Sequence, residues 1–148
     1  RQGVTDLPSV INRYDEALQA EKGAYIVSDC EGTPDIILFA SGSEVSTLIE
    51  GALKLDSEGI KCRVVSVPSE GLFRSQSRAY QKAILPDGVI KFGLTAGLPI
   101  NLEGLVGANG KVFGLNSFGF SAPYKVLDEK LGFNGTNVYA QVKELLKT

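Results

Sequence analysis

Serines near the ends of three expected strands are the residues of this chain best placed for chemistry. Ser41 and Ser43 follow an apolar run, and further serines lie within 66–69 and 117–121. In an open α/β sheet, ligands bind beyond the carboxyl ends of the strands, and free N–H groups at a helix start favour anions. A phosphate could therefore bind at 41–43. Because a serine three residues before Glu44 also fits a capping box, we expect capping to be the main role of this segment.

Other catalytic chemistry has little support in the residue types. The chain has no histidine, so acid–base catalysis would depend on Asp, Glu, Lys, Tyr or Cys. Glu44 and Glu70 lie near strand ends, but neither has a second carboxylate at a spacing typical of a catalytic pair. Cys30 and Cys62 lack a CxxC spacing, and we expect two free thiols in a reducing compartment. Neither GxGxxG nor GxxxxGK[ST] occurs. We expect no catalytic, cofactor or metal site in these residues.

Composition narrows the class of protein. The 148 residues are 43% hydrophobic and 22% charged, which suits one globular domain. The net charge of −2 favours neither nucleic acid nor an anionic membrane as a partner. No apolar run is long enough for a membrane span, and no signal peptide is visible. Methionine is absent, so we expect the chain to be a piece of a longer protein.

Strand and helix patterns alternate along the chain. Apolar runs predict five strands, at 25–27, 35–40, 61–67, 89–94 and 111–115. Helical periodicity predicts helices after Ser43, over 72–85, from 121 to Gly132, and after a cap at Thr136. Strands that alternate with helices predict an α/β fold, a three-layer αβα sandwich with a mostly parallel sheet of about five strands. Residues 1–22 are expected to be a linker arm from a preceding domain, and 23–148 the domain itself.

Four segments resemble one known family. Residues 22–25 read KGAY, 39–45 read FASGSEV, 63–69 read RVVSVPS, and 118–133 contain FG, SAP, VL, K and GF. These resemble, in order, KGAYV, (V/I)ATGSEV, RVVSMPS and FG.SAP..VL..K.GF of the transketolase C-terminal domain. The matches run in order over nearly the whole chain. The chain is therefore identified as similar to that domain.

The resemblance implies an activity that lies mostly outside this chain. Transketolases move a two-carbon ketol unit from ketose phosphates to aldose phosphates with thiamine diphosphate and Mg²⁺ or Ca²⁺. Their first two domains hold the cofactor and form the active site across a homodimer interface. The C-terminal domain is then expected to be non-catalytic, with a structural or regulatory role in supporting the dimer. A cytoplasmic parent is implied, although a plastid or peroxisome is open.

Arg1 is the one candidate site residue that the resemblance supplies. In the family, an S/T-R-Q-x-L-P stretch ends the middle domain, and its arginine binds the substrate phosphate. Arg1 and Gln2 match the R-Q pair, although residues 3–6 separate them from Leu7 and Pro8. A guanidinium group suits phosphate oxygens, because its fork of N–H donors matches their geometry. We therefore expect Arg1 to bind the sugar phosphate in the parent enzyme.

The chain also departs from the family pattern, and two alternatives stay open. Thr95 stands where the family usually has a glutamate, and Asn116 and Ser117 replace the D-R of its D-R-F-G motif. Losing both members of an ion pair can be nearly neutral in stability. One alternative is the last domain of a related thiamine enzyme: dihydroxyacetone synthase, deoxyxylulose-phosphate synthase or a 2-oxoacid dehydrogenase β subunit. The other is a stand-alone regulatory module that binds a small anion at 41–43.

Overall fold

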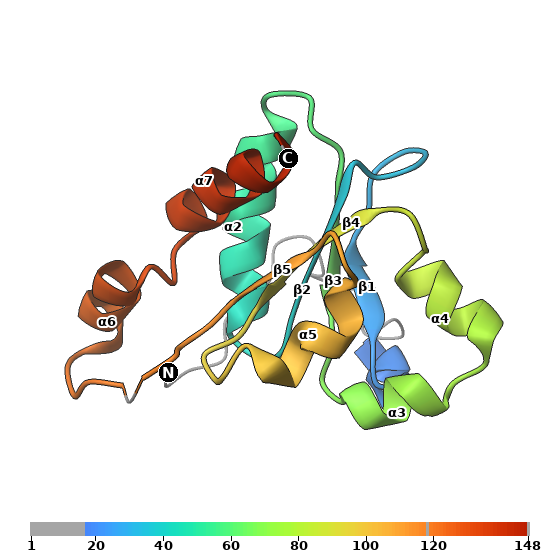
Figure 1. The fold of residues 1–148 in the computed structure, drawn as a ribbon, viewed down its shortest axis with the longest axis horizontal. Helices are drawn as coiled ribbons and strands as arrows, with labels where there is room; N and C mark the ends of the chain where they lie inside the picture. The colour runs from blue at the N-terminus through green and yellow to red at the C-terminus, as the bar shows by residue number, and fades with distance from the viewer. Residues whose placement is uncertain (1–16, 118, 148) are drawn as a thin grey trace.

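A five-stranded mixed sheet forms the centre of the domain (Figure 1). A computed structural model describes residues 17–117 and 119–147. The strand order is β1-β3-β2-β4-β5, in which β1 runs antiparallel to β3 and every other pair is parallel. The strands are β1 (Tyr25–Ser28), β2 (Ile36–Ala40), β3 (Cys62–Ser66), β4 (Ile90–Leu94) and β5 (Lys111–Phe113). The predicted fold class is confirmed, with one antiparallel edge strand.

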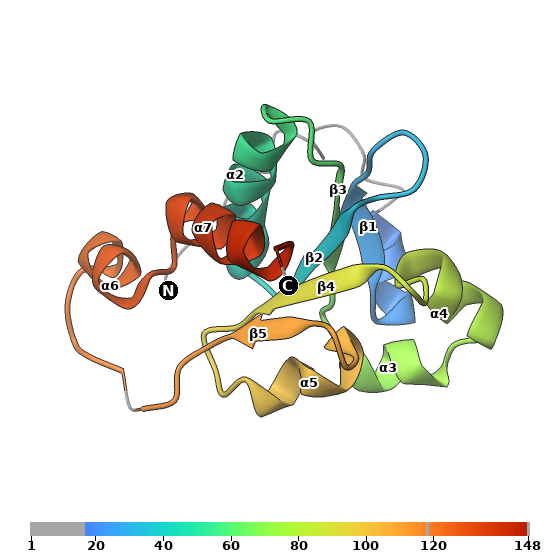
Figure 2. The same ribbon diagram turned by 45° about the horizontal axis from the view of Figure 1, so that its top comes forward.

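Helices cover both faces of the sheet (Figure 2). One face packs against α2 (Glu44–Asp56) and α7 (Gly135–Leu145). The other packs against α3 (Glu70–Ser75), α4 (Arg78–Ile84) and α5 (Ile100–Val106). A 3₁₀ helix, η2 (Leu18–Lys22), precedes β1, and α6 (Tyr124–Leu131) lies between β5 and α7. The domain therefore has the three predicted layers.

The central strand β2 shows why the sequence is apolar there. All five of its residues are buried. Ile36 and Leu38 join the core under α2 and α7, whereas Ile37 and Phe39 join the core on the opposite face. Successive side chains of a strand point to opposite faces, so a strand covered on both sides must be continuously apolar. The helices over each face bury these residues from water.

Three local expectations were wrong in detail. The stretch 72–85 forms two short helices, α3 and α4, each with a serine cap: Ser69 accepts from Leu72 N and Ser77 from Tyr80 N. The last helix is capped by Asn134, whose side chain accepts from Asn137 N, and not by Thr136. Helix α5 was not predicted, because Gly104 and Gly107 dilute its apolar pattern. Within the described residues, no helix is long and apolar enough to cross a membrane.

Candidate functional site

The carboxyl ends of the four parallel strands lie along one edge of the sheet. These strands end at Ala40, Ser66, Leu94 and Phe113. The loops that follow them carry the serines that the sequence offered as possible contacts. They also carry Thr95 and Asn116, which depart from the family pattern. Ligands of open α/β sheets usually bind at this edge. We therefore consider it the candidate site and take its loops in turn.

The 41–43 segment does not form the predicted capping box. Ser43 precedes α2, and its side chain accepts no cap hydrogen bond from the helix. Instead, Ser43 Oγ donates to Glu44 Oε1 at 3.0 Å. The Glu44 side chain lies in the first turn and is buried. A carboxylate at a helix N-terminus is stabilised by the helix dipole. Glu44 therefore already places a carboxylate at the N-terminus of α2, the position that a phosphate ion would take.

The loop after β3 is occupied by structural contacts. Val67 N donates to Ala40 O at 2.8 Å, and Ser69 N donates to Gly23 O at 3.1 Å. Gly23 has φ +84° and no room for a side chain, because a Cβ would lie 2.3 Å from Phe73 N. The Ser69 hydroxyl caps α3. This loop holds η2 and α3 against the sheet, so its serines have a packing role.

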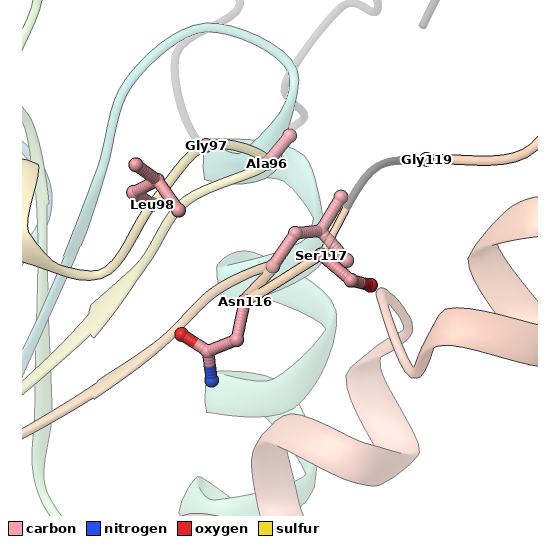
Figure 3. A pocket seen from close by; sticks show the side chains of 7 residues that line it. Ala96, Gly97, Leu98, Asn116, Ser117 and Gly119 are labelled. Carbon is pink, nitrogen blue, oxygen red and sulfur yellow. The ribbon is translucent and has the colours of Figure 1, made fainter.

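A pocket of about 530 Å³ lies where β4 and β5 end (Figure 3). Its lining residues are Ala96, Gly97, Leu98, Leu115, Asn116, Ser117 and Gly119. The 96–98 loop lies on one side, with Asn116 and Ser117 on the other (Figure 3). None of the described lining residues is charged. The pocket can therefore hold an apolar group with a few neutral hydrogen bonds, but it offers no cation to a sugar phosphate.

Thr95 fixes the shape of this pocket. Its Oγ1 accepts from Gly97 N at 3.1 Å, and its backbone N donates to Phe113 O at 3.0 Å. Leu115 N donates to Gly97 O at 3.0 Å, which ties the two loops together. A Cβ on Gly114 would lie 2.8 Å from Gly97 O, so the loops approach closely. Thr95 therefore acts on the local backbone, at the place where the family pattern has an acid.

A second, smaller pocket of about 140 Å³ lies at the opposite edge, beside β4 and the end of α5. Lys91 lines it and is only 8% exposed. Its Nζ donates to Val89 O at 3.0 Å. Burial lowers the pKa of Lys91, because a desolvated ammonium ion is less stable than its neutral form. Sequence reasoning missed this residue, since a lysine inside a short apolar strand gives no sign that its neighbours will cover it.

Groups that could hold a metal ion are absent from residues 17–117 and 119–147. Both cysteines are free thiols, with Cys62 buried and Cys30 half-buried. Burial raises the pKa of the Cys62 thiol to about 12. Arg1 and Phe118 lie outside the described residues. Of the positions marked in the sequence, the structure brings Asn116 and Ser117 into one pocket, whereas Ser43, Glu44 and Ser69 belong to helix starts.

Comparison with known proteins shows the family. A sequence model described as "Transketolase-like TK C-terminal domain" matches residues 23–134. That stretch is most of the chain and includes every strand. The chain belongs to the transketolase C-terminal domain family.

Individual transketolases agree with this assignment. Transketolase 2 of Aliivibrio fischeri is 46% identical over 126 residues, and transketolase 1 of Escherichia coli is 42% identical over 126 residues. Each match covers 84% of this chain but only 19% of the relative. The chain thus spans about a fifth of the length of these transketolases.

Solved transketolase structures share the fold. A transketolase variant from Pichia stipitis superposes with a TM-score of 0.86 at 28% identity, covering 99% of this chain and 20% of that one. Transketolase from Leishmania mexicana gives a TM-score of 0.80 at 35% identity over 88% of this chain and 19% of its own. The fold of this chain is therefore the fold of the transketolase C-terminal domain.

Proposed function

We propose that this chain is the C-terminal domain of a transketolase and supports an active site built by other domains. The parent would transfer a two-carbon ketol unit from ketose to aldose phosphates, with thiamine diphosphate and Mg²⁺ or Ca²⁺ in its first two domains. The observation that carries this proposal is the match over residues 23–134 to a domain that makes up about 19% of each relative. A Pichia stipitis relative is described as a complex with sedoheptulose-7-phosphate.

The chemistry of the carboxyl edge supports a non-catalytic role. The described lining of the pocket, from 96–98, 115–117 and Gly119, is neutral, and the Glu44 carboxylate already occupies the start of α2. The sequence has no histidine to exchange protons near neutral pH. Bond making and breaking therefore belong to the domains that precede this one. A cytoplasmic parent is part of the same proposal.

Exposed apolar side chains favour docking onto the rest of the parent enzyme. No residue of α6 is buried in the described structure, and Tyr124 and Val126 are 48% and 55% exposed. Leu98 and Ile100, after β4, are 55% and 68% exposed. An amphipathic helix normally buries one face. Because the chain is a fifth of its relatives' length, we assign the cover for α6 to the other domains of the parent dimer.

A domain exchange tests this function directly. The C-terminal domain of Escherichia coli transketolase 1, a relative with 42% identity, is replaced by this chain. We expect a dimer that binds thiamine diphosphate and turns over xylulose 5-phosphate, because the exchanged domain supplies support and no reacting group. A folded, cofactor-loaded dimer without turnover would contradict the proposal.

The exposed apolar face of α6, with Tyr124 and Val126, can be tested as a docking surface by substitution. In the exchanged enzyme, Val126→Asp on α6 should weaken the dimer, as measured by sedimentation at decreasing concentration. Leu53→Asp is the matched control, since Leu53 is also exposed, at 66%, but lies on α2. Equal effects of the two substitutions would show that α6 has no special place in the assembly.

Binding measurements on the isolated chain distinguish this proposal from the alternative of a regulatory module that binds an anion. We expect calorimetry to detect no saturable binding of thiamine diphosphate. Titration with inorganic phosphate should likewise give no saturation in the millimolar range, because Glu44 occupies the helix start. Saturable phosphate binding that Ser43→Ala abolishes would favour the regulatory module instead.

A further inference from the structure

The pairing of β1 with β3 sets the positions of the two cysteines. Tyr25 lies opposite Ser66 and Ile26 opposite Val65. After a bulge, Ser28 lies opposite Val64. Opposed residues of antiparallel strands point to the same face of the sheet. Beyond the bulge, the antiparallel register should continue: each step forward along the segment after Ser28 should lie opposite one step back along β3 from Val64.

An ion pair shows that this register continues past the end of β1. Asp29 follows Ser28, and Arg63 precedes Val64. Arg63 Nε donates to Asp29 Oδ1 at 2.9 Å, and Arg63 Nη2 donates to Asp29 Oδ2 at 3.0 Å. Arg63 Nη1 also donates to Ala83 O at 2.8 Å, at the end of α4. The two side chains thus lie together on the α4 face, as opposed residues must.

Extending the register by one further step predicts that Cys30 lies opposite Cys62, on the other face of the sheet. Cys62 belongs to the core beneath α2 and α7. Opposed residues of antiparallel strands have Cβ atoms about 4.5–5.5 Å apart. A disulfide requires a Cβ separation of about 3.5–4.5 Å and a Cα separation of about 4.4–6.8 Å. The 29–30 segment lies outside the hydrogen-bonded strand, so a small approach of this segment would bring the pair within this range.

The two thiols differ in access. Cys30 is half-buried, whereas Cys62 is 8% exposed and its Sγ donates to Ile60 O at 3.5 Å. Burial is the largest cause of the raised pKa of Cys62, and negative charge on Asp56, Cys30 and Asp35 adds to it. Cys30 is therefore the thiol that meets a reagent first, and Cys62 is the resolving thiol behind it.

We propose that Cys30 and Cys62 are a cross-strand redox pair, which a disulfide oxidant such as oxidised glutathione converts to an intramolecular disulfide. The Cys30 thiolate attacks one sulfur of the oxidant, and one glutathione thiolate leaves and takes up a proton. Cys62 then loses its proton to solvent and attacks Cys30 Sγ, which releases the second glutathione. Two protein thiols are oxidised to one disulfide, and one oxidant molecule is reduced to two thiols.

Mass spectrometry of the purified chain after treatment with oxidised glutathione tests the pair. The wild type should lose two hydrogen atoms and yield one peptide pair linked through Cys30 and Cys62. Cys62→Ser should stop with one glutathionyl group on Cys30, because the resolving thiol is missing. Cys30→Ser should stay unmodified, because Cys62 is covered. A wild type that also stops at the mixed disulfide, or links only between molecules, would overturn the proposal.

Thermal unfolding gives a second readout that needs no substitution. The disulfide would close a long loop that contains β2, α2 and the start of β3, and so would restrict the unfolded chain. We expect the oxidised wild type to unfold roughly 5–15 °C higher than the reduced form, and dithiothreitol to reverse the shift. An oxidised, linked chain with an unchanged or lower Tm would mean that the bond forms only by distorting the fold, which contradicts a built redox pair.

Discussion

Gly51 of α2 lies directly against Val138 of α7. A Cβ at position 51 would lie 2.5 Å from Val138 Cγ1, which is closer than real side chains approach. Gly135, the first residue of α7, is equally crowded, because its Cβ would lie 2.6 Å from Glu50 Cβ. The two helices therefore cross at a pair of glycines. At this close contact the two helices pack together over one face of the sheet.

Gly51→Ala should destabilise the domain by about 1–3 kcal/mol, because an added methyl group overpacks a rigid contact. Denaturant unfolding monitored by circular dichroism measures the change. Gly71→Ala in α3 is the matched control: its Cβ would meet nothing within 4 Å, so alanine should be neutral or stabilise by up to about 1 kcal/mol. Val138→Ala added to Gly51→Ala should recover part of the loss. Equal stability of the two alanine variants would refute the crowding.

Glu58, which follows α2, should make the stability of the fold depend on pH in the acidic range. Lys143 Nζ and the Tyr139 hydroxyl, both on α7, donate to its two carboxylate oxygens. The hydrogen bond from Lys143, and next that from Tyr139, lowers the pKa of Glu58. A carboxylate whose folded pKa is depressed stabilises the fold above its unfolded pKa, and this is lost as pH falls through the folded pKa.

We therefore expect Glu58→Gln to lower Tm at neutral pH, and the gap from wild type to close as the pH falls to about 3. Differential scanning calorimetry at several pH values measures it. Glu103→Gln on α5 is the control, and it should show no such closing gap. A gap for Glu58→Gln that is constant with pH would mean that the charge of Glu58 is irrelevant to the contact between α2 and α7.

Lys91 should give a pH dependence of the same sign, but at the alkaline end. Burial lowers its pKa, so between its folded and unfolded pKa values the unfolded chain binds more protons. The stability of the wild type relative to Lys91→Met should then rise as pH increases through that window. Urea unfolding at increasing pH measures the difference, with Lys125→Met on exposed α6 as control. A relative stability that stays flat or falls would show that Lys91 is solvated in the folded state.

Arg1 remains a prediction that rests on the family motif. In the intact parent, Arg1→Ala should raise KM for phosphorylated sugars by roughly 10–100-fold, with a smaller effect on kcat, because a charge-assisted contact to phosphate is lost. Steady-state kinetics with a phosphorylated and an unphosphorylated acceptor would separate the two effects. Arg78→Ala, on α4, is the control. An unchanged KM would mean that the R-Q match is accidental.

The sequence predicted the elements that depend on continuous local patterns. The run 36–40 is apolar throughout because both faces of β2 are covered, and most of the α2 stripe follows from simple helical periodicity. Leu53, at the edge of the predicted stripe, is an exception, because it is 66% exposed. Helix α5 has only two buried residues, Leu102 and Val106, so its pattern was too short to recognise. Strand order was also beyond local reasoning. The antiparallel placement of β1 depends on pairing with β3, which lies far along the chain.

The candidate site was predicted less well, for a similar reason. Ser41 to Glu44 fits a capping box, but Ser43 bonds to Glu44, which is buried in the fold. The pocket lined by 96–98, 115–117 and Gly119 depends on the hydrogen bonds that join two loops separated in sequence. Asn116 and Ser117 were noticed only as departures from a family pattern. Their position in the pocket depends on tertiary contacts, which the local sequence does not show.

The outermost strands of the sheet are both short. At one side β1 has four residues and is interrupted by its bulge, and at the other β5 has three and begins with Lys111. A short or irregular edge strand offers few unpaired backbone N–H and C=O groups to a second molecule, and a lysine there repels the same lysine of another copy. The separately expressed domain should therefore resist aggregation through pairing of its edge strands. This property would help it to stay monomeric at high concentration and in domain-exchange experiments.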